Sequence, residues 1–157
     1  MAKQIEVTKI FNAPVEMVWQ VWVDPELVKR WWGPKDFTSP VAKIDFREGG
    51  KSLVSMQAPK EMGGREWYSI WEYVEIIPLR SIEFIQSLAD QDGNKTDPTK
   101  VGMPPDFPKD IKTVVTFREL ANDKTEMTVT EYADFGSISN FAQIGLEQSL
   151  DKMTAIF

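Results

Sequence analysis

Hydrophobic and polar side chains alternate along much of the chain, and a period of two is typical of β-strands that bury one face. The alternation is clearest in the last strand-like segment of the chain, where Met127 and Val129 stand between polar neighbours. Alternation, or a run of aromatic and β-branched residues, predicts strands over 4–11, 41–46, 53–57, 67–77, 82–87, 111–120 and 125–132. Because short turns join most of these strands, they favour an antiparallel meander.

Two short helices are predicted directly after the first strand. Pro14 is expected at the first position of one helix, where the missing N–H of proline is not needed. Asp24 is placed to cap the second helix, which begins at Pro25. Gly33 and Pro34 then end it, because glycine tolerates a left-handed cap and proline cannot continue a helix.

The C-terminal segment 137–157 repeats apolar side chains at steps of three and four, which predicts one long amphipathic helix. The sheet is the available partner for that apolar stripe. Gly145 within it is unfavourable by about 1 kcal/mol, which indicates close approach of another element or room for something else. Segment 89–110, rich in proline and glycine, is either a functional lid or a decorated loop. We find no internal repeat and predict one α+β domain over 1–157.

The composition excludes several kinds of chemistry. The 157 residues include no His and no Cys, so a disulfide framework, a thiolate nucleophile, a Cys/His zinc site and a Ser-His-Asp triad are all absent. An enzyme built on this chain would have to use carboxylates, Tyr, Lys or a bound cofactor. We predict no metal and no cofactor.

The net charge and the hydropathy of the chain limit the kinds of partner that it can bind. With 18 basic and 24 acidic residues the formal net charge is −6, which disfavours binding to nucleic acid. No stretch approaches the roughly 20 apolar residues needed to cross a bilayer, and no apolar run precedes a cleavage site. We therefore expect a cytoplasmic protein without membrane insertion.

Large aromatic and Met side chains are abundant, with six Trp, nine Phe and seven Met. Such residues fill a core or line an apolar ligand pocket, and composition does not distinguish the two. A curved sheet that grips a long helix leaves a tapered space, roughly 300–1,000 Å³ when a ligand occupies it. The residues expected to face that space are Val54, Met56, Trp71, Phe84, Val115, Phe117, Met127, Val129, Phe141 and Leu146.

Several motifs resemble one family. Phe11-Asn12-Ala13-Pro14 and the proline-started segment 24–34, which ends in Trp31-Trp32-Gly33-Pro34, are similar to the start of activator-of-heat-shock-protein-90-ATPase homologue domains. Segments 45–50, 75–80 and 145–153 match later landmarks of the same family in order, so the resemblance covers essentially the whole chain. These domains belong to the START/birch-pollen-allergen-like (SRPBCC) superfamily.

The resemblance implies a helix-grip fold, in which a curved seven-stranded antiparallel sheet wraps around a long C-terminal helix and encloses a hydrophobic cavity. It also implies binding of a small hydrophobic or amphipathic molecule and a link to the stress response. In the eukaryotic activators this domain is coupled to another that also contacts the chaperone, and we expect this chain to be too short for both.

Three positions depart from the family pattern. Glu48 stands where relatives commonly have Pro, Ser52 where many have a large aromatic residue, and Leu146 where many have Trp. The last two changes shrink side chains near the expected cavity. The space is then either larger than in relatives or filled by polar groups and water.

The residues predicted to bind a ligand are Trp32, Val54, Met56, Tyr68, Trp71, Glu72, Phe84, Val115, Phe117, Phe141 and Leu146. Glu72 faces either the cavity, as a general acid or base, or solvent, and Tyr68 shares its face. Gln86 and Thr113 are weaker polar candidates. Trp31 and Trp32 either form a mouth or pack the corner between helices, and packing is favoured for at least one of them.

Three hypotheses of function follow. The first is a small-molecule-binding domain without catalysis. The second is a cyclase, dehydratase or hydrolase acting on a polyketide-like substrate, which requires an inward, desolvated carboxylate at the floor of the pocket. The third is an interaction module that contacts a chaperone or forms a homodimer, which would expose an apolar patch away from the cavity mouth.

Overall fold

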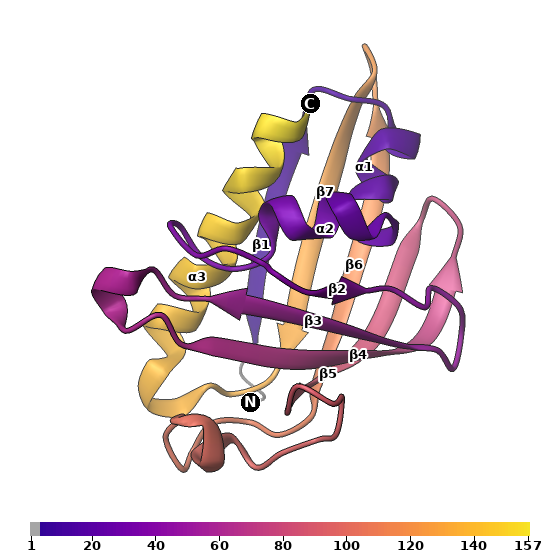
Figure 1. The fold of residues 1–157 in the computed structure, drawn as a ribbon. Coiled ribbons are helices and arrows are strands. Elements are labelled where there is room, and N and C mark those ends of the chain that lie inside the picture. Colours follow the sequence, from indigo (N-terminus) through magenta and orange to yellow (C-terminus); the bar gives the residue numbers. More distant parts are fainter. Residues whose placement is uncertain (1–3) are drawn as a thin grey trace.

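The computed structural model describes residues 4–157 and contains one seven-stranded antiparallel sheet with strand order β1-β7-β6-β5-β4-β3-β2 (Figure 1). The strands are β1 (Ile5–Phe11), β2 (Ala42–Lys43), β3 (Lys51–Gln57), β4 (Glu66–Ile77), β5 (Ser81–Ala89), β6 (Ile111–Leu120) and β7 (Lys124–Tyr132). The sheet bends strongly, so that β3 and β4 cross the direction of β1 and β7 in Figure 1. The predicted α+β class and antiparallel meander are confirmed.

Three α-helices lie against this curved sheet: α1 (Val15–Val23), α2 (Pro25–Trp31) and α3 (Ser139–Met153). The Asp24 side chain accepts a hydrogen bond from the Glu26 backbone N–H at 2.9 Å and so caps α2 as predicted. The α3 helix runs beside β1 and packs against it and against α2 (Figure 1). Short 3-10 turns are η1 (Lys60–Met62), η2 (Pro98–Val101), η3 (Gly136–Ile138) and η4 (Thr154–Ile156).

The boundaries of three predicted elements are corrected. Pro14 has an extended backbone and precedes α1 instead of starting it. The strand predicted over 41–46 is only Ala42–Lys43, because the Asp45 N–H donates to the Ser52 hydroxyl and leaves the ladder. The helix predicted over 137–157 is α3 with the 3-10 turns η3 and η4 at its ends.

The strand register decides which side chains face the helices. Directly paired residues of antiparallel strands point to the same side of the sheet. One inner row joins Ile82, Val115 and Val129, which are 0–1% exposed, and the neighbouring row joins Phe84, Thr113 and Glu131. Lys51, Glu72 and Ile85 pair directly across β3, β4 and β5, and this row belongs to the opposite, outer face.

The inner face is filled near α1 and α2 by a cluster of aromatic rings. The ring centroids of Trp22 and Trp31 lie 4.6 Å apart, and those of Trp71 and Phe84 lie 5.1 Å apart. Trp31 is fully buried and its Nε1 donates to the Val21 carbonyl at 2.7 Å, so this residue packs the corner between α1 and α2. Most of the aromatic surplus is therefore core.

Candidate ligand-binding cavity

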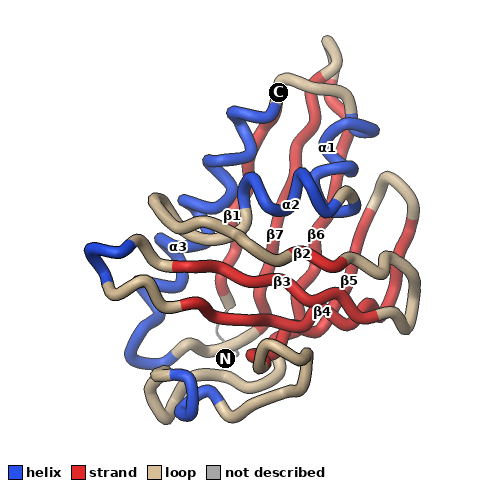
Figure 2. Tube along the Cα trace, in the orientation of Figure 1, coloured by secondary structure: helices blue, strands red, loops and turns tan. Residues whose placement is uncertain are grey.

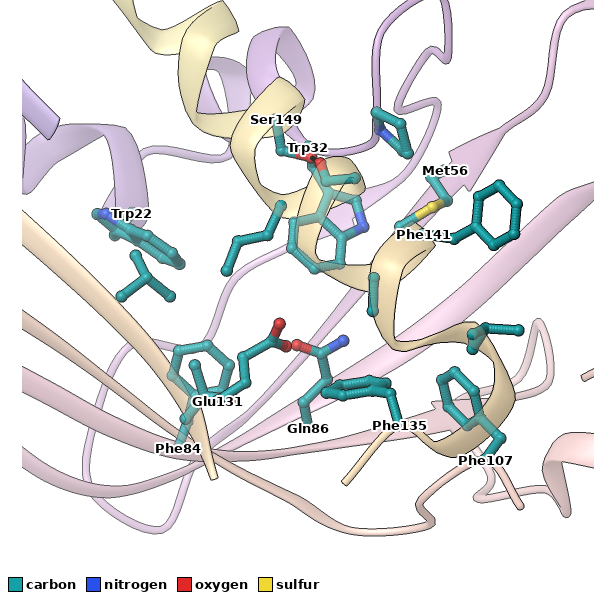
Figure 3. Close-up of a pocket in the computed structure, with 17 residues that line it drawn as sticks. Trp22, Trp32, Met56, Phe84, Gln86, Phe107, Glu131, Phe135, Phe141 and Ser149 are labelled. Atoms are coloured by element: carbon teal, nitrogen blue, oxygen red, sulfur yellow. Dashed lines mark hydrogen bonds between the residues drawn. The ribbon is translucent and has the colours of Figure 1, made fainter. Parts of the chain in front are cut away.

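A cavity of about 220 Å³ remains between the inner face of the sheet and α3. The sheet contributes Met56, Phe84, Gln86, Thr113, Val129 and Glu131 to its lining. The helix contributes Phe141, Ala142, Gly145, Leu146 and Ser149. Figure 3 shows these side chains converging from the two elements on one space. The lining is mainly apolar; its polar side chains are Gln86, Thr113 and Glu131 on the strands and Ser149 on α3.

Among the described residues, Glu131 is the one titratable residue that lines this cavity. It comes from β7, with Thr113 of β6 and Ile5 of β1 as its paired neighbours, and it is 9% exposed. Burial away from water raises the pKa of its carboxyl to about 7. Within residues 4–157 no hydrogen bond or ion pair to this carboxyl is found, so desolvation acts without compensation.

Two neutral polar groups lie on the same inner face as Glu131. The Thr113 hydroxyl donates to the Ile111 carbonyl at 3.3 Å, which leaves its oxygen lone pairs free to accept. Gln86 reaches the cavity from β5, and Figure 3 shows its amide and the Glu131 carboxyl on the floor of the space. We call the strand surface formed by Glu131, Gln86 and Thr113 the floor of the cavity. It offers several hydrogen-bond acceptors beneath apolar walls.

One wall is formed by the loop before β6 and the connection after β7. Phe107 and Phe135 pack edge to face with ring centroids 5.6 Å apart, and both line the cavity. The Asp106 carboxylate accepts hydrogen bonds from the Ser137 N–H at 2.8 Å and from its hydroxyl at 3.0 Å, which lowers the pKa of Asp106. Figure 2 shows this loop at the same end of the molecule as the start of α3.

Two residues of α3, Phe141 and Gly145, mark the entrance of the cavity and a part of it that no side chain fills. Phe141 lines the cavity but is 75% exposed, so the cavity reaches solvent beside it. Gly145 lies where an added Cβ would sit 3.5 Å from the Pro34 side chain, an ordinary contact distance. A methyl group would therefore fit here, and the absence of a larger side chain leaves the cavity unfilled at this point.

The sequence-predicted ligand residues fall into three groups. Trp32, Met56, Phe84, Phe141 and Leu146 line the cavity. Val54, Trp71, Val115 and Phe117 lie in the closed core, at most 7% exposed. Tyr68 and Glu72 lie on the outer face of β4, because they alternate with the inward Trp71 and Tyr73. That placement removes the geometric basis for a general acid at Glu72, while contact with a ligand stays a prediction for the five lining residues.

Glu131 is the residue that the sequence interpretation missed. Its signal was present, since it stands two and four positions after the inward Val129 and Met127. A period of two therefore places it on the buried face. Gln86 and Thr113, the weaker polar candidates, do line the cavity beside it.

Two further properties concern metals and membranes. In the described part of the chain, no group of three or more acidic residues is arranged to hold a metal ion. None of the helices within residues 4–157 has the length and apolar character needed to cross a membrane.

Comparison with known proteins supports the fold. The family described as "Activator of Hsp90 ATPase homolog 1-like protein" matches residues 12–157. A crystal structure of a Mycobacterium smegmatis protein is similar with a TM-score of 0.76 at 24% identity, over 98% of this chain and 90% of that one. A solution structure of an Arthrobacter aurescens protein has a TM-score of 0.79 at 23% identity, over 99% and 86% of the two chains.

The AHSA1 protein of Silicibacter pomeroyi is similar with a TM-score of 0.73 at 16% identity, over 98% of this chain and 96% of that one. Identities this low show a shared fold alone. No curated protein matches the sequence.

Proposed function

The chain belongs to the activator of Hsp90 ATPase homolog 1-like family, and from that premise we propose that it binds a small amphipathic molecule between its sheet and α3. The fold fits a ligand-binding domain. The observation that carries the proposal is the cavity of about 220 Å³, whose walls are apolar and whose floor holds Glu131, Gln86 and Thr113.

The driving force for binding would be removal of apolar ligand surface from water. Enclosing about 200 Å² of such surface at about 25 cal/mol per Å² contributes about 5 kcal/mol before the entropy of association is subtracted. The polar floor adds orientation, because a ligand must satisfy the groups it covers. A molecule with an apolar body and one polar end matches both parts of the lining.

The loop 89–110 is proposed to control access. Phe107 closes one side of the cavity, and the hydrogen bonds from Ser137 to Asp106 tie the loop to the turn that precedes α3. Release of those bonds would free the segment that carries Phe107, while the hydrogen bonds from Trp67 to the Val101 carbonyl and from Ser87 to Asp110 would still attach the loop to β4 and β5. The exposed Phe141 marks the other side of the entrance.

A cavity-filling variant tests the proposal. In the wild type, 3-phenylpropan-1-ol at ten times its Kd should stabilise the fold by about 1.4 kcal/mol, which raises Tm by about 3–6 °C. Ala142→Phe fills the cavity from α3 and should abolish that rise. The matched control Asn140→Phe adds the same side chain at an exposed position of α3 and should keep it. An equal rise in Ala142→Phe, or none in the wild type, would exclude enclosure in this cavity.

Acid–base catalysis is the second candidate, and Glu131 favours it. A general acid or base works best with a pKa near the operating pH, and burial raises the pKa of Glu131 to about 7. A cyclase, dehydratase or hydrolase of a polyketide-like substrate would therefore use Glu131 in the role first considered for Glu72. Incubation with such a substrate, followed by mass spectrometry, distinguishes an enzyme, which returns product, from a binder, which returns the compound unchanged.

Contact with a chaperone, or with a second copy of this chain, stays a prediction of the family resemblance. Light scattering after size exclusion measures self-association, and a pull-down with the purified chaperone measures the other contact. A monomer that retains no chaperone would remove this interpretation.

A further inference from the structure

The part of the chain that the structure describes places one acidic group and no basic group in the cavity lining. The acidic group is Glu131, and none of the lining residues found within 4–157 is Lys or Arg. The basic residue on the inner face of β1 is Lys9, which pairs across with Met127, four residues before Glu131, and is bound to the Asp151 carboxylate of α3. The nearest inward-facing cation of that strand is therefore engaged elsewhere.

The strand groups around Glu131 offer acceptors, and the Trp32 Nε1–H, which has no partner among the described residues, is a donor elsewhere in the lining. The Glu131 carboxyl has no partner of its own within residues 4–157. Thr113, its partner in the β ladder, has already used its hydroxyl proton on the Ile111 carbonyl and keeps lone pairs for another donor. The Gln86 amide oxygen is a third acceptor on the same floor. Three acceptors on one floor match the three N–H groups of a primary ammonium.

The size of the cavity limits the body of the ligand. A volume of about 220 Å³ lies above the roughly 150 Å³ cavity that holds benzene. It lies below the roughly 300 Å³ at which pockets for drug-sized molecules begin. One aromatic ring with a short chain fits this range, and Phe84, Phe107 and Phe135 supply aromatic walls.

From these observations, and on the basis of the function proposed above, we propose that the ligand is a primary arylalkylamine whose ammonium group is held by the Glu131 carboxylate. A cation brought by the ligand supplies the charge partner that the protein itself does not provide. An anionic ligand would instead place a second negative charge beside Glu131 in a site of low polarity, which is strongly unfavourable. A neutral alcohol would gain a hydrogen bond to the same polar groups but no charge partner.

Three ligands that differ only in the polar end test this assignment: 3-phenylpropan-1-amine, 3-phenylpropan-1-ol and 3-phenylpropanoate. Affinities are measured by calorimetry at pH 7.5 and physiological salt, which screens the charges on the outer surface. In the wild type the amine should bind about tenfold or more tightly than the alcohol, in proportion to a charge-assisted hydrogen bond, and the carboxylate should bind most weakly.

Two matched variants locate the effect. Glu131→Gln should lower the affinity for the amine about tenfold or more. The affinity for the alcohol should stay unchanged. Glu72→Gln removes the same charge from the outer face and should change neither. At pH 6.5, amine binding to the wild type should release a proton, which is read from the heat measured in buffers of different ionisation enthalpy.

Several results would overturn the assignment. An alcohol or carboxylate that binds the wild type as tightly as the amine would do so, as would an unchanged amine preference in Glu131→Gln. An equal loss in Glu72→Gln would attribute the preference to the net charge of the protein. If the alcohol binds and the amine does not, only the amine assignment fails. If none of the three binds, the proposed function fails with it.

Discussion

Ionisation of Glu131 should make the protein less stable as the pH rises toward neutrality. The native fold raises the pKa of this carboxyl from 4.5 to about 7 through burial, so the folded chain holds the proton more tightly than the unfolded chain. Where the native state binds more protons, stability falls with increasing pH. At 1.36 kcal/mol per pKa unit, the loss in the free energy of unfolding is about 1 kcal/mol at pH 5.5 and about 3 kcal/mol at pH 8.

The variant Glu131→Gln isolates that loss, because its amide resembles the neutral acid and does not titrate. Its advantage over the wild type should grow by about 2 kcal/mol between pH 5.5 and pH 8, equivalent to about 4–8 °C in Tm for a chain of this length. Denaturant unfolding followed by tryptophan fluorescence measures it, with Glu72→Gln as the outer-face control. Wild-type and Glu131→Gln curves that stay parallel across this range would refute the reasoning.

Three further predictions follow from particular contacts. Phe84→Ala should lower the free energy of unfolding by about 3–5 kcal/mol because Phe84 is 1% exposed. Phe141→Ala should lower it by less than about 0.5 kcal/mol because Phe141 is 75% exposed. Chemical denaturation measures both losses, and similar values would contradict the placement of Phe84 in the core. Tyr73→Phe removes the 2.8 Å hydrogen bond to Ser52 and should cost about 1 kcal/mol near neutral pH. Because burial raises the pKa of Tyr73 from 10.0 to about 12, the wild type should lose stability between pH 10 and 12, and alkaline unfolding of Tyr73→Phe should lack that loss. Asp106→Ala removes the acceptor of the Ser137 N–H and should speed hydrogen exchange at that amide, while unchanged exchange would show that the loop is held by other contacts.

Most of the fold was predictable because the sequence carries a local signal for each element. The strands β6 and β7 follow from alternation, and Asp24 and Pro25 mark the start of α2. The short β2 was not predictable in this way, since it ends where a side chain, Ser52, takes over the backbone N–H of Asp45. That competition depends on the tertiary position of β3, which local pattern does not describe.

The candidate site was predictable only in part. Side chains such as Met56 and Phe84 were placed on the inner face by parity, but Val54 and Trp71 have the same parity and lie in the closed core. What covers each side chain separates the two groups: Trp71 packs against the rings of Trp22 and Trp31, whereas Met56 faces the cavity. The pattern along a strand does not describe that covering. The sequence did not decide which face of the sheet Glu72 lies on, because β4 is a long run of large residues without clean alternation.

The position of Glu131 connects the stability and the proposed binding through one thermodynamic cycle. Near neutral pH the free protein keeps a buried carboxyl whose ionisation lowers its stability, although a Gln of the same shape would avoid that cost. A cation at the cavity floor would restore part of what ionisation removes, because the attraction within a hydrogen-bonded ion pair opposes the loss of hydration. Glu131→Gln should therefore be the more stable protein and the weaker binder of amines. If Glu131 had a purely structural role, Glu131→Gln would lower the free energy of unfolding instead of raising it. Unfolding and amine binding, measured together, therefore distinguish a residue that serves a ligand from one that serves the fold.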